Sequence, residues 1–400
     1  MKILLLSTWF PYPPDNGSRI RAYNLLKHVA ARHAVHLVSF TRGHEADGRG
    51  EIRAMCASVE TVPWIEFVPT RWRALLGYFS VAPRSVVDTY SRTMDRHVKC
   101  RLLENSFGIV VALQSPAARY VPPRLTVPAL LDEVEIGVLR DAAVRETRWL
   151  AYIRAQLRYA KLKRYLGNLL GRFRVCTVVS QPEAQWLREA VPHYDSVYVV
   201  PNGVDTDHYR PSDNAPQPDT LIYSGALTYS ANYDAVAYFL GDIMPRIQAE
   251  VPEVQFRVTG STRGVALERL PRRPGVVFTG YVEDIRPVVA GSWALVVPLR
   301  VGGGTRLKIL EAMALGTPVI STAKGAEGLN VRQEENILIA DDPDDFAAQT
   351  VRLLRDPALR RRLAENGRRL VEQKYSWAEI GRQFCHLVEQ VADTGRRHIC

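Results

Sequence analysis

The residues best suited to chemistry lie at 302–311, where three consecutive glycines precede Arg306, Lys308 and Glu311. Glycines let backbone amides approach an anion closely, and the N-terminus of a helix adds roughly half a positive charge. The apolar run before the glycines predicts a buried strand, and the residues after them predict a helix whose first turn carries Arg306 and Lys308. A strand, a glycine loop and a cationic helix start together predict a phosphate-binding site.

Glu311 extends this prediction from a phosphate to a nucleotide diphosphate. It lies about one turn further along the predicted helix, roughly 5–8 Å, which matches the reach from a diphosphate to the hydroxyls of its ribose. The alternative is a glycine-rich turn that caps an ordinary helix. Arg306 argues against that alternative, because a cation at a helix N-terminus opposes the helix dipole at a cost of about a few tenths of a kcal/mol unless an anion lies beside it.

The chain is long enough to build two domains around these residues. Its 400 residues exceed what one core accommodates and suit two domains of about 170–200 residues each. Hydrophobic residues make up 46% and charged residues 24%, which is typical of a folded soluble protein and excludes extensive disorder. The net charge of +10 favours an anionic partner such as a nucleotide, a lipid headgroup or a nucleic acid.

The cysteines and the N-terminus indicate a reducing compartment, and we expect a cytoplasmic protein. Five cysteines are scattered without a CxxC pair, which indicates neither a disulfide framework nor a zinc site. The apolar run at residues 2–7 is too short for a signal peptide or a membrane span and reaches a proline-rich loop at once. It therefore predicts a first buried strand.

Short apolar runs alternate with helical patterns, which predicts parallel sheets joined by crossover helices. Strands are expected near residues 2–6, 35–40, 109–113, 128–131, 176–180 and 197–200 in the first half, and near 220–224, 254–259, 276–279, 294–297, 318–321 and 337–340 in the second. The fold class is therefore α/β with two Rossmann-like doubly wound domains, separated by a turn at 201–203 and a linker at 211–219. Because ligands bind beyond the carboxyl ends of parallel strands, loops from both halves are expected to meet at one cleft.

Several segments resemble, in order and spacing, a family 4-type glycosyltransferase of the GT-B fold. They are the glycine loop, residues 200–207, 225–235, 278–285 and 375–377, and more weakly 13–26 and 132–135. The resemblance implies an acceptor-binding domain at 1–200 and a nucleotide-sugar-binding domain at 201–376. It also implies that a helix and tail at 377–400 cross back to the first domain.

The resemblance also implies the residues of both substrate sites. On the donor side these are Asn202, Gly225, Gly260, Tyr281, Val282, Gly302, Gly303, Gly304, Thr305, Arg306, Leu307, Lys308 and Glu311, of which Arg306, Lys308 and Glu311 are the catalytic candidates. On the acceptor side they are Asp15, Gly17, Ser18, Asp132, Glu133 and Glu135.

Two departures from the family pattern concern the donor site. The family has two glutamates eight positions apart, and here the first falls on Gly303 while the second matches Glu311. The arginine and lysine that grip the diphosphate after the first strand of the second domain fall on Ala226 and Ala231. We interpret Arg306 and Lys308 as replacements for those two cations.

No metal site and no cofactor are predicted. His28, His33, His36 and His44 recur in the first half without a third ligand in view, and we interpret them as structural or surface residues. The acidic run 341–345 is typical of a helix N-cap with an acidic first turn. The helix dipole and the cations would then stabilise the departing diphosphate.

The reaction implied by the resemblance is glycosyl transfer with retention. In that reaction the leaving phosphate accepts the proton of the acceptor hydroxyl, so that no dedicated base is required. If a base exists, the candidates are Asp15, Asp132, Glu133 and Glu135, although an orienting or structural role is favoured for each. A glycosidase pair of carboxylates is not recognisable from sequence separation, so hydrolysis is not supported.

Residues 140–174 form a second unusual segment. They carry ten Lys or Arg against two acids, interleaved with aromatic and aliphatic residues. Such a basic amphipathic helix suits an anionic membrane surface at the inner face and a saccharide or lipid-linked acceptor. The alternative is a helix whose apolar stripe packs on its own sheet while its cations stay in water. Nucleic-acid binding is disfavoured, because no base-reading module is present.

Three functions remain open on the sequence alone. The first is a nucleotide-sugar transferase in glycan, exopolysaccharide or lipid-linked saccharide synthesis. The second is an epimerase or a phosphorylase on the same fold, which would consume the donor without an acceptor or respond to inorganic phosphate. The third is a non-catalytic nucleotide-binding protein. The sugar, the nucleobase, the acceptor and the oligomeric state are not determined by the sequence.

Overall fold

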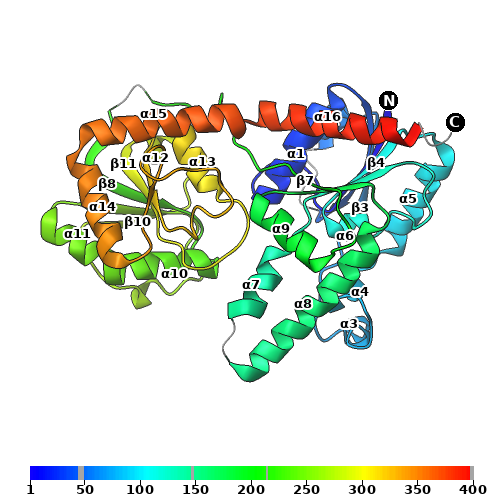
Figure 1. Cartoon of the computed structure of the whole chain (residues 1–400), viewed down its shortest axis with the longest axis horizontal. Helices are drawn as coiled ribbons and strands as arrows, with labels where there is room; N and C mark the ends of the chain where they lie inside the picture. Colours follow the sequence, from blue (N-terminus) through cyan, green and yellow to red (C-terminus); the bar gives the residue numbers. More distant parts are fainter. Residues whose placement is uncertain (44–48, 146–147, 213–214, 397–400) are drawn as a thin grey trace. The chain divides into compact units, whose positions relative to one another are not determined.

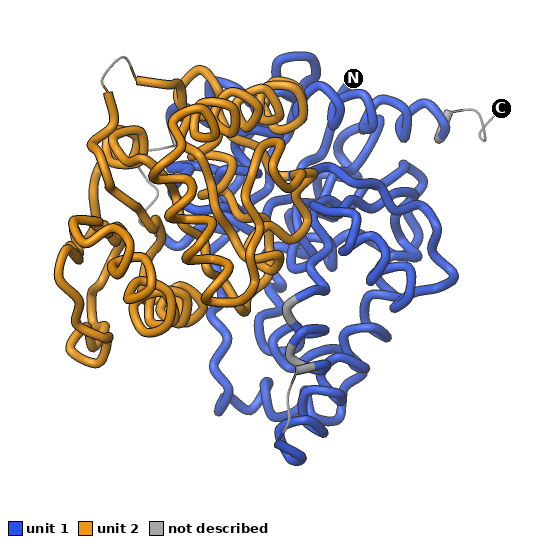
Figure 2. The backbone as a smooth tube through the Cα atoms, turned by 60° about the vertical axis from the view of Figure 1, so that its left-hand side comes forward, with its two compact units in different colours: residues 1–201, 380–400 blue, residues 202–379 orange. Residues whose placement is uncertain are grey.

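The computed structural model describes residues 1–43, 49–145, 148–212 and 215–396. The chain divides into two compact units, Met1–Pro201 with Ile380–Cys400 (unit 1) and Asn202–Glu379 (unit 2), as Figure 2 shows. The predicted division at residues 200 and 201 lies one residue from this boundary. The two doubly wound α/β domains expected from the alternating pattern are confirmed.

Unit 1 contains a seven-stranded parallel sheet in the order β3-β2-β1-β4-β5-β6-β7. Its strands are β1 (Lys2–Ser7), β2 (Ala34–Thr41), β3 (Ser58–Pro63), β4 (Ile109–Leu113), β5 (Ala129–Asp132), β6 (Val175–Val178) and β7 (Val197–Val199). Its helices are α1 (Gly17–Ala30), α2 (Arg49–Met55), α3 (Trp72–Leu76), α4 (Arg84–Asp88), α5 (Arg92–Glu104), α6 (Ser115–Ala118), α7 (Gly137–Arg145), α8 (Trp149–Leu170) and α9 (Gln181–Ala190). The central strands β1 and β4 are almost wholly buried, which explains their continuous apolar runs.

Unit 2 contains a six-stranded parallel sheet in the order β10-β9-β8-β11-β12-β13. Its strands are β8 (Gln217–Ser224), β9 (Gln255–Thr259), β10 (Val276–Gly280), β11 (Ser292–Val297), β12 (Val319–Ser321) and β13 (Leu338–Ile339). Its helices are α10 (Ser230–Tyr238), which continues through a π-turn at Phe239–Ile243 into α11 (Met244–Glu250), a 3₁₀ turn at Leu267–Arg269, α12 (Arg286–Ala290), α13 (Leu307–Ala314), α14 (Pro343–Arg355) and α15 (Pro357–Lys374). Helices α10 and α11 lie on one side of the sheet and α13 and α15 on the other (Figure 1).

The last helix, α16 (Trp377–Arg396), leaves unit 2 and joins unit 1 from Ile380 onward. Its apolar stripe includes Ile380, Phe384 and Val388, which recur every four residues and are fully buried. This spacing places them on one face of the helix, which packs into unit 1.

The structure corrects three predictions of the chain's local organisation. Strand β3 was not expected, because it is an edge strand with half-buried side chains and lacks a continuous apolar run. Residues 140–174 form two helices, α7 and α8, instead of one, and residues 146–147 lie outside the described part. The linker predicted at 211–219 ends early, because β8 begins at Gln217.

Candidate functional site

Strands β8 and β11 are neighbours at the centre of the unit 2 sheet. The chain continues from β8 to β9 on one side of this pair and from β11 to β12 on the other. Ligands of doubly wound sheets bind beyond the carboxyl ends of strands at such a reversal of strand order. Gly225 follows β8 at this point, and Gly302, Gly303 and Gly304 follow β11 and lead into α13. The fold therefore brings together two loops that are far apart in the sequence and that were both predicted to bind the donor.

Two glycines allow these loops to approach one another. A Cβ atom on Gly260 would lie 2.5 Å from the Gly225 carbonyl oxygen, and a Cβ on Gly225 would lie 2.7 Å from Nζ of Lys308. Both glycines have positive φ, +130° for Gly260 and +150° for Gly225. Side chains at these positions would separate the loops and displace the lysine, so glycine is required at both.

Hydrogen bonds from Arg306 and Asn202 hold the triple-glycine loop at its C-terminal end. Gly302 and Gly304 adopt φ values of +110° and +78°. The Arg306 guanidinium turns back and donates to the carbonyl oxygens of Gly303 and Gly302, the latter at 2.9 Å. At the same end of the loop, Nδ2 of Asn202 donates to Oγ1 of Thr305 at 3.2 Å. These bonds hold the loop in one shape before a ligand arrives.

Arg306 differs from its prediction in two respects. It is the N-cap residue of α13 rather than a member of the first turn, because φ −83° and ψ 76° are not helical. Its side chain is buried, with 7% of the residue exposed, and its guanidinium engages loop carbonyls. In this ligand-free geometry Arg306 holds the glycine loop and adds a positive charge behind it.

Lys308 carries the central charge of the site. Its Nζ donates to Oδ1 of Asn232 at 3.2 Å and lies 3.9 Å from the centre of the Tyr223 ring. Burial and, to a smaller extent, the nearby Arg306 lower the pKa of Lys308 to about 7, while Glu311 opposes this shift. In the described part of the chain, this half-buried lysine has no carboxylate within ion-pair distance, so the site favours an added anion.

Asn232 and Tyr223 were missed by the sequence analysis. Oδ1 of Asn232 accepts from the Tyr223 hydroxyl at 2.7 Å, and Nδ2 of Asn232 donates to the Ala226 carbonyl oxygen at 2.8 Å. The pair therefore positions Lys308 and ties α10 to the loop after β8. Tyr223 resembled an ordinary buried strand residue, and only the fold places its hydroxyl against Asn232.

Glu311 lies one turn beyond Lys308 on α13 and is half-buried. Burial raises the pKa of Glu311, and Lys308 opposes that rise. Among the described residues its carboxylate has no hydrogen-bond or ion-pair partner. A partly buried acceptor without a partner is suited to hydroxyl donors of a ligand.

The two alanines at the family's cation positions lie beside these groups. The loop that contains Ala226 passes Lys308, since the ideal Cβ of Gly225 lies 2.7 Å from Nζ. Ala231 lies against the glycine loop, where its Cβ is 3.3 Å from an ideal Cβ on Gly302. Lys308 therefore lies beside the loop that contains Ala226.

The remaining predicted donor residues lie at the edges of this cluster. Leu307 is half-buried and packs against the unit 2 core. Tyr281 and Val282 follow β10, two strands from β8, and the Tyr281 side chain is 77% exposed.

Unit 1 carries a different arrangement at the carboxyl ends of its strands. The Arg21 guanidinium makes a buried two-pronged ion pair with Asp132, Nε to Oδ2 at 2.8 Å and Nη2 to Oδ1 at 2.6 Å. The Thr177 hydroxyl donates to the same carboxylate at 2.6 Å. Burial alone would lower the pKa of Arg21, but Asp132 outweighs it and raises the pKa. Asp132 is thus engaged within the protein.

Glu133, the next residue, is the unusual acid of unit 1. It adopts φ +59° next to Gln114 at φ +69°, and both are non-glycine residues in the left-handed region. Nε2 of Gln114 donates to Oε2 of Glu133 at 2.7 Å. Burial raises the pKa of Glu133 to about 8, against which Arg21 acts. The raised pKa favours the protonated form of Glu133 at neutral pH, and in that form it can donate a hydrogen bond.

A small surface depression lies beside Glu133. It is lined by Ser7, Trp9, Ser18, Arg21, Ala22, Leu113, Gln114, Asp132 and Glu133. Ser18 belongs to the first turn of α1, whose first residue is Gly17. The fold thus brings together three of the predicted acceptor-side residues, Ser18, Asp132 and Glu133.

Asp15 and Glu135 lie apart from this depression. The exposed Asp15 carboxylate accepts from Nη1 of Arg19 at 3.1 Å and from Nδ2 of Asn16 at 2.9 Å, just before α1. Glu135 is exposed. Neither side chain lines the depression beside Glu133.

The histidines of the first half lie in separate places. His36 bonds to the Ser58 hydroxyl at 2.8 Å, and burial lowers the pKa of both His36 and His28. His44 lies outside the described residues. Cys56, Cys100, Cys176 and Cys385 are free thiols, and Cys400 lies outside the described residues.

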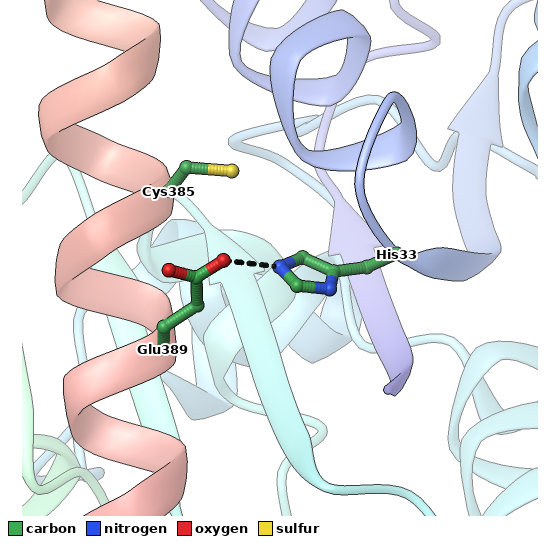
Figure 3. A group of neighbouring side chains, drawn as sticks. All are labelled: His33, Cys385 and Glu389. Atoms are coloured by element: carbon green, nitrogen blue, oxygen red, sulfur yellow. Dashed lines mark hydrogen bonds and ion pairs between the residues drawn. The ribbon is translucent and has the colours of Figure 1, made fainter.

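One cluster of the described residues has metal-ligand chemistry. The candidate ligand atoms of His33, Cys385 and Glu389 lie within 4.8 Å of one another (Figure 3). Glu389 already pairs with Nε2 of His33 at 3.0 Å and with Arg32 at 3.5 Å. Burial raises the pKa of the Cys385 thiol, whereas metal binding requires the thiolate. The cluster is best explained as the contact that fixes α16 to the loop after α1.

The acidic runs of unit 2 serve as caps. Asp342 is the N-cap of α14 and accepts from the backbone amides of Asp344 and Asp345, as predicted. Asp205 accepts from the amides of Asp207 and His208 and closes a turn. Neither run presents a converging set of carboxylates.

Comparisons with known proteins agree with these arrangements. A model of Glycosyltransferase Family 4 matches residues 15–208, and a model of Glycosyl transferases group 1 matches residues 218–356. The chain is 26% identical over 271 residues to the MMP alpha-(1->4)-mannosyltransferase of Mycolicibacterium hassiacum, covering 64% of this chain and 62% of that protein. It is 25% identical over 235 residues to a GDP-mannose-dependent monoacylated alpha-(1-6)-phosphatidylinositol monomannoside mannosyltransferase of Corynebacterium glutamicum, covering 54% and 62%. The chain therefore spans less than two thirds of either relative.

Solved structures extend the likeness to the fold. Sucrose-phosphate synthase of Thermosynechococcus elongatus matches with a TM-score of 0.73 and 19% identity, over 98% of this chain and 100% of that chain. HepE of Anabaena, solved in complex with UDP, matches with a TM-score of 0.67 and 15% identity over the same shares. At such identities the likeness is one of fold.

Proposed function

Because this chain belongs to the family 4-type glycosyltransferases with the GT-B fold, we propose that it moves a sugar from a nucleotide-diphosphate sugar to an acceptor hydroxyl. The observation that carries the proposal is Lys308. A half-buried lysine held by Asn232 and Tyr223, beside a glycine loop and without a carboxylate ion-pair partner in the described chain, is arranged for a diphosphate. The solved relative in complex with UDP supports the ligand class.

In the proposed complex, the diphosphate lies between the glycine loop and the start of α13. The loop amides, the helix N-terminus and Lys308 stabilise it, and Arg306 adds charge from behind the loop. Glu311 binds the ribose hydroxyls, because it lies one turn further along the same helix. Asn202, Gly225, Gly260, Tyr281 and Val282 complete the donor site at the neighbouring strand ends.

We propose that transfer proceeds with retention and without a metal. The bond from the anomeric carbon to the phosphate oxygen breaks as the acceptor oxygen forms the new glycosidic bond, and the hydroxyl proton passes to the leaving phosphate. Negative charge develops on that phosphate, where Lys308 and the helix start are placed to stabilise it. EDTA is accordingly expected to leave the rate unchanged, and a requirement for added magnesium or manganese would contradict this part of the proposal.

The acceptor is proposed to bind in unit 1, at the depression that Glu133 and Gln114 line. A protonated glutamate and a neutral amide suit the hydroxyls of a saccharide. The Corynebacterium relative, which by its name acts on a phosphatidylinositol mannoside, supports a lipid-linked saccharide as acceptor. No helix in the described part of the chain has the length and apolar character to cross a bilayer. A peripheral site of action at the membrane is proposed because a lipid-linked acceptor would lie at the membrane surface.

Nucleotide binding tests the donor site most directly. With a free pKa of about 7, Lys308 is mostly neutral at pH 8 and must take up a proton when a diphosphate binds. A thermal-shift panel of UDP, GDP, ADP and dTDP would identify the nucleotide. Calorimetry of that nucleotide at pH 8, in buffers of different ionisation enthalpy, should then show uptake of close to one proton. Uptake should vanish in Lys308→Arg, since arginine is already charged.

Two results would overturn the proposal. One is a protein that responds to none of the four nucleotides. The other is donor consumption that is independent of any acceptor, or that depends on inorganic phosphate. Nucleotide binding without proton uptake at pH 8 would overturn only the role of Lys308.

A further inference from the structure

Helix α8 has two apolar faces, and only one of them is covered. Leu166, Leu169 and Leu170 pack into the core of unit 1. At about 100° per residue, Trp149, Leu150, Ile153 and Leu157 form a stripe nearly opposite that core face. These four side chains are 70%, 53%, 43% and 61% exposed. An amphipathic surface helix normally keeps this second face polar.

The segment that contains α3 exposes a second set of large apolar side chains. Trp72 is 67% exposed, Leu76 53%, Tyr78 59% and Phe79 92%. Leu75 is also exposed. In an isolated surface loop such side chains would fold inward, since their exposure to water is unfavourable.

Internal bonds hold this segment in its outward-facing shape. Nε of Arg84 donates to the Ala74 carbonyl oxygen at 3.0 Å, and the Arg84 guanidinium lies 4.0 Å from the centre of the Tyr78 ring. The buried Asp88 carboxylate accepts from the Val68 amide at 3.0 Å and pairs with Arg71 at 3.1 Å. The hydrogen bonds and the ion pair lie on the inner side of the segment, while its apolar side chains face solvent. The conformation with exposed apolar side chains is therefore the stable one.

Lys161 joins the two apolar sets. Its Nζ donates to the carbonyl oxygens of Gly77 and Tyr78, each at 2.9 Å, and thereby fixes the α3 segment to α8, as the neighbouring positions of α3, α4 and α8 in Figure 1 illustrate. Leu157 lies one turn from Lys161 on α8, and Trp149 lies three turns from it. We call the combined set the α3–α8 surface, defined by Trp72, Leu75, Leu76, Tyr78, Phe79, Trp149, Leu150, Ile153 and Leu157.

The charge around the α3–α8 surface selects its partner. Residues 67–87 and 147–182 contain no Asp or Glu, but together they contain eleven Lys or Arg. Arg154, Arg158 and Arg164 are exposed on α8 beside the apolar stripe. A second copy of the chain docked on this surface would place like charges against each other. A partner that is both apolar and anionic satisfies both features.

We infer that the α3–α8 surface inserts into the interface of an anionic phospholipid bilayer. Its aromatic and aliphatic side chains enter the headgroup and acyl boundary, while the arginines of α8 contact the lipid phosphates. Lys161 is not one of these cations, because its amine donates to the carbonyl oxygens of Gly77 and Tyr78. The inference concerns unit 1 and does not depend on the proposed glycosyl transfer, although it suits a lipid-linked acceptor.

Vesicle flotation of the full chain tests the inference. The wild type is expected to bind vesicles of phosphatidylcholine mixed with phosphatidylglycerol about tenfold better than pure phosphatidylcholine, and added salt should weaken the binding. A variant with Leu76→Ser, Phe79→Ser, Ile153→Ser and Leu157→Ser should bind the anionic vesicles about tenfold more weakly. A variant with Arg154→Gln, Arg158→Gln and Arg164→Gln should retain weak binding that no longer depends on salt.

Matched controls distinguish binding through the α3–α8 surface from non-specific binding through other exposed apolar or charged side chains. Leu103 is 88% exposed on α5, and Leu103→Ser should leave vesicle binding unchanged. Arg361→Gln with Arg362→Gln removes exposed cations from α15 and should also leave it unchanged. Lipids brominated in their acyl chains should quench tryptophan fluorescence in the wild type, and Trp72→Phe with Trp149→Phe should abolish that quenching without abolishing binding.

Equal recovery of the wild type and the apolar variant with anionic vesicles would overturn the inference, as would an absence of quenching by brominated lipid. A concentration-dependent dimer that the apolar variant loses, without vesicle binding by the wild type, would assign the surface to a second copy and would also overturn it. All variants should keep the wild-type thermal response to nucleotide. A wild type that binds vesicles but no nucleotide would contradict the proposed function and leave this inference standing.

Discussion

The two units place opposite electrostatics at equivalent points of similar sheets. In unit 2 the strand ends around β8 and β11 surround a half-buried lysine, Lys308, without a carboxylate ion-pair partner among the described residues. In unit 1 the corresponding region contains a cation, Arg21, that Asp132 neutralises within the protein. Beside that pair lies Glu133, whose protonated form burial favours at neutral pH. One site therefore favours an added anion, and the other favours a neutral ligand that bears hydroxyls.

The comparison shows how one architecture can serve two ligands of different charge. An uncompensated buried cation destabilises the ligand-free protein and is relieved when an anion binds. A compensated ion pair has no such demand, and its role is to hold the surrounding loops in place. The two sites should therefore respond oppositely to mutation: loss of Asp132 should lower the stability of the protein, and loss of the Lys308 charge should raise it.

The largest effect is expected from breaking the compensated pair. Asp132→Asn leaves the Arg21 guanidinium buried without its counter-charge, which typically costs about 3–5 kcal/mol. Differential scanning fluorimetry of the full chain should show a marked loss of thermal stability. The exposed Asp195 offers a matched control, and Asp195→Asn should change little. If Asp132→Asn were as stable as wild type, the ion pair of Arg21 and Asp132 would not stabilise the surrounding loops.

Lys308→Met should have the opposite effect on the ligand-free protein. The folded pKa of about 7 lies below the ordinary value of 10.5, so that the native state resists protonation, and the cost at neutral pH is on the order of 2–4 kcal/mol. The variant should therefore melt roughly 4–10 °C higher without ligand. It should also lose about 100-fold or more of kcat/KM, because its cation is absent.

The pH dependence of this effect sharpens the test. Between pH 7 and 10.5 the wild type should gain stability relative to Lys308→Met as pH rises, since the unfolded chain binds the proton that the native state lacks. Lys374 is exposed, and Lys374→Met should reproduce neither the stabilisation nor the loss of turnover. A variant at position 308 with full activity would remove Lys308 from the donor site.

Glu311→Gln should mainly weaken binding of the donor. Loss of a charge-assisted hydrogen bond to the ribose corresponds to about 1.5–3 kcal/mol, or roughly 10–150-fold in donor kcat/KM. Steady-state kinetics with varied donor would measure it, and Glu311→Ala should be at least as severe. Folding should be intact, because the carboxylate has no internal partner in the described structure. Unchanged donor kinetics would contradict the role, with the exposed Glu365→Gln as reference.

Glu133→Gln should give the smallest change in activity. At pH 7 the amide resembles the protonated acid, so we expect acceptor KM within a few-fold of wild type. The change in wild-type stability with pH that Glu133 causes should have the opposite sign to the change that Lys308 causes. The wild type loses stability from pH 4.5 to 8, by up to about 1.4 kcal/mol per unit, because the native state retains the proton that the unfolded chain releases.

Melting curves of Glu133→Gln and wild type from pH 5 to 9 would measure this trend, with the exposed Glu104→Gln as reference. Parallel curves for all three proteins would mean that Glu133 is ionised in the fold. The acceptor site would then carry a negative charge rather than a neutral donor.

Much of the fold was predictable because buried parallel strands leave a strong local signal. Twelve of the thirteen strands lie where apolar runs indicated them, and the glycine loop stands between β11 and α13 as expected. Strand β3 escaped because an edge strand has half-buried side chains and therefore a mixed pattern. The charge of 140–174 was visible, but its division into α7 and α8 was not, since no proline or glycine separates them.

The sequence by itself determined the two doubly wound domains and the residues of the phosphate loop, because periodicity and glycine spacing act over a few residues. Only the tertiary structure decided which charges are neutralised. Arg21 and Asp132 are 111 residues apart, and Lys308 and Asn232 are 76 apart, so that no local pattern pairs them. The same holds for Lys161, which meets Gly77 through the fold. Ion pairing and burial depend on distance in space, which sequence separation does not encode.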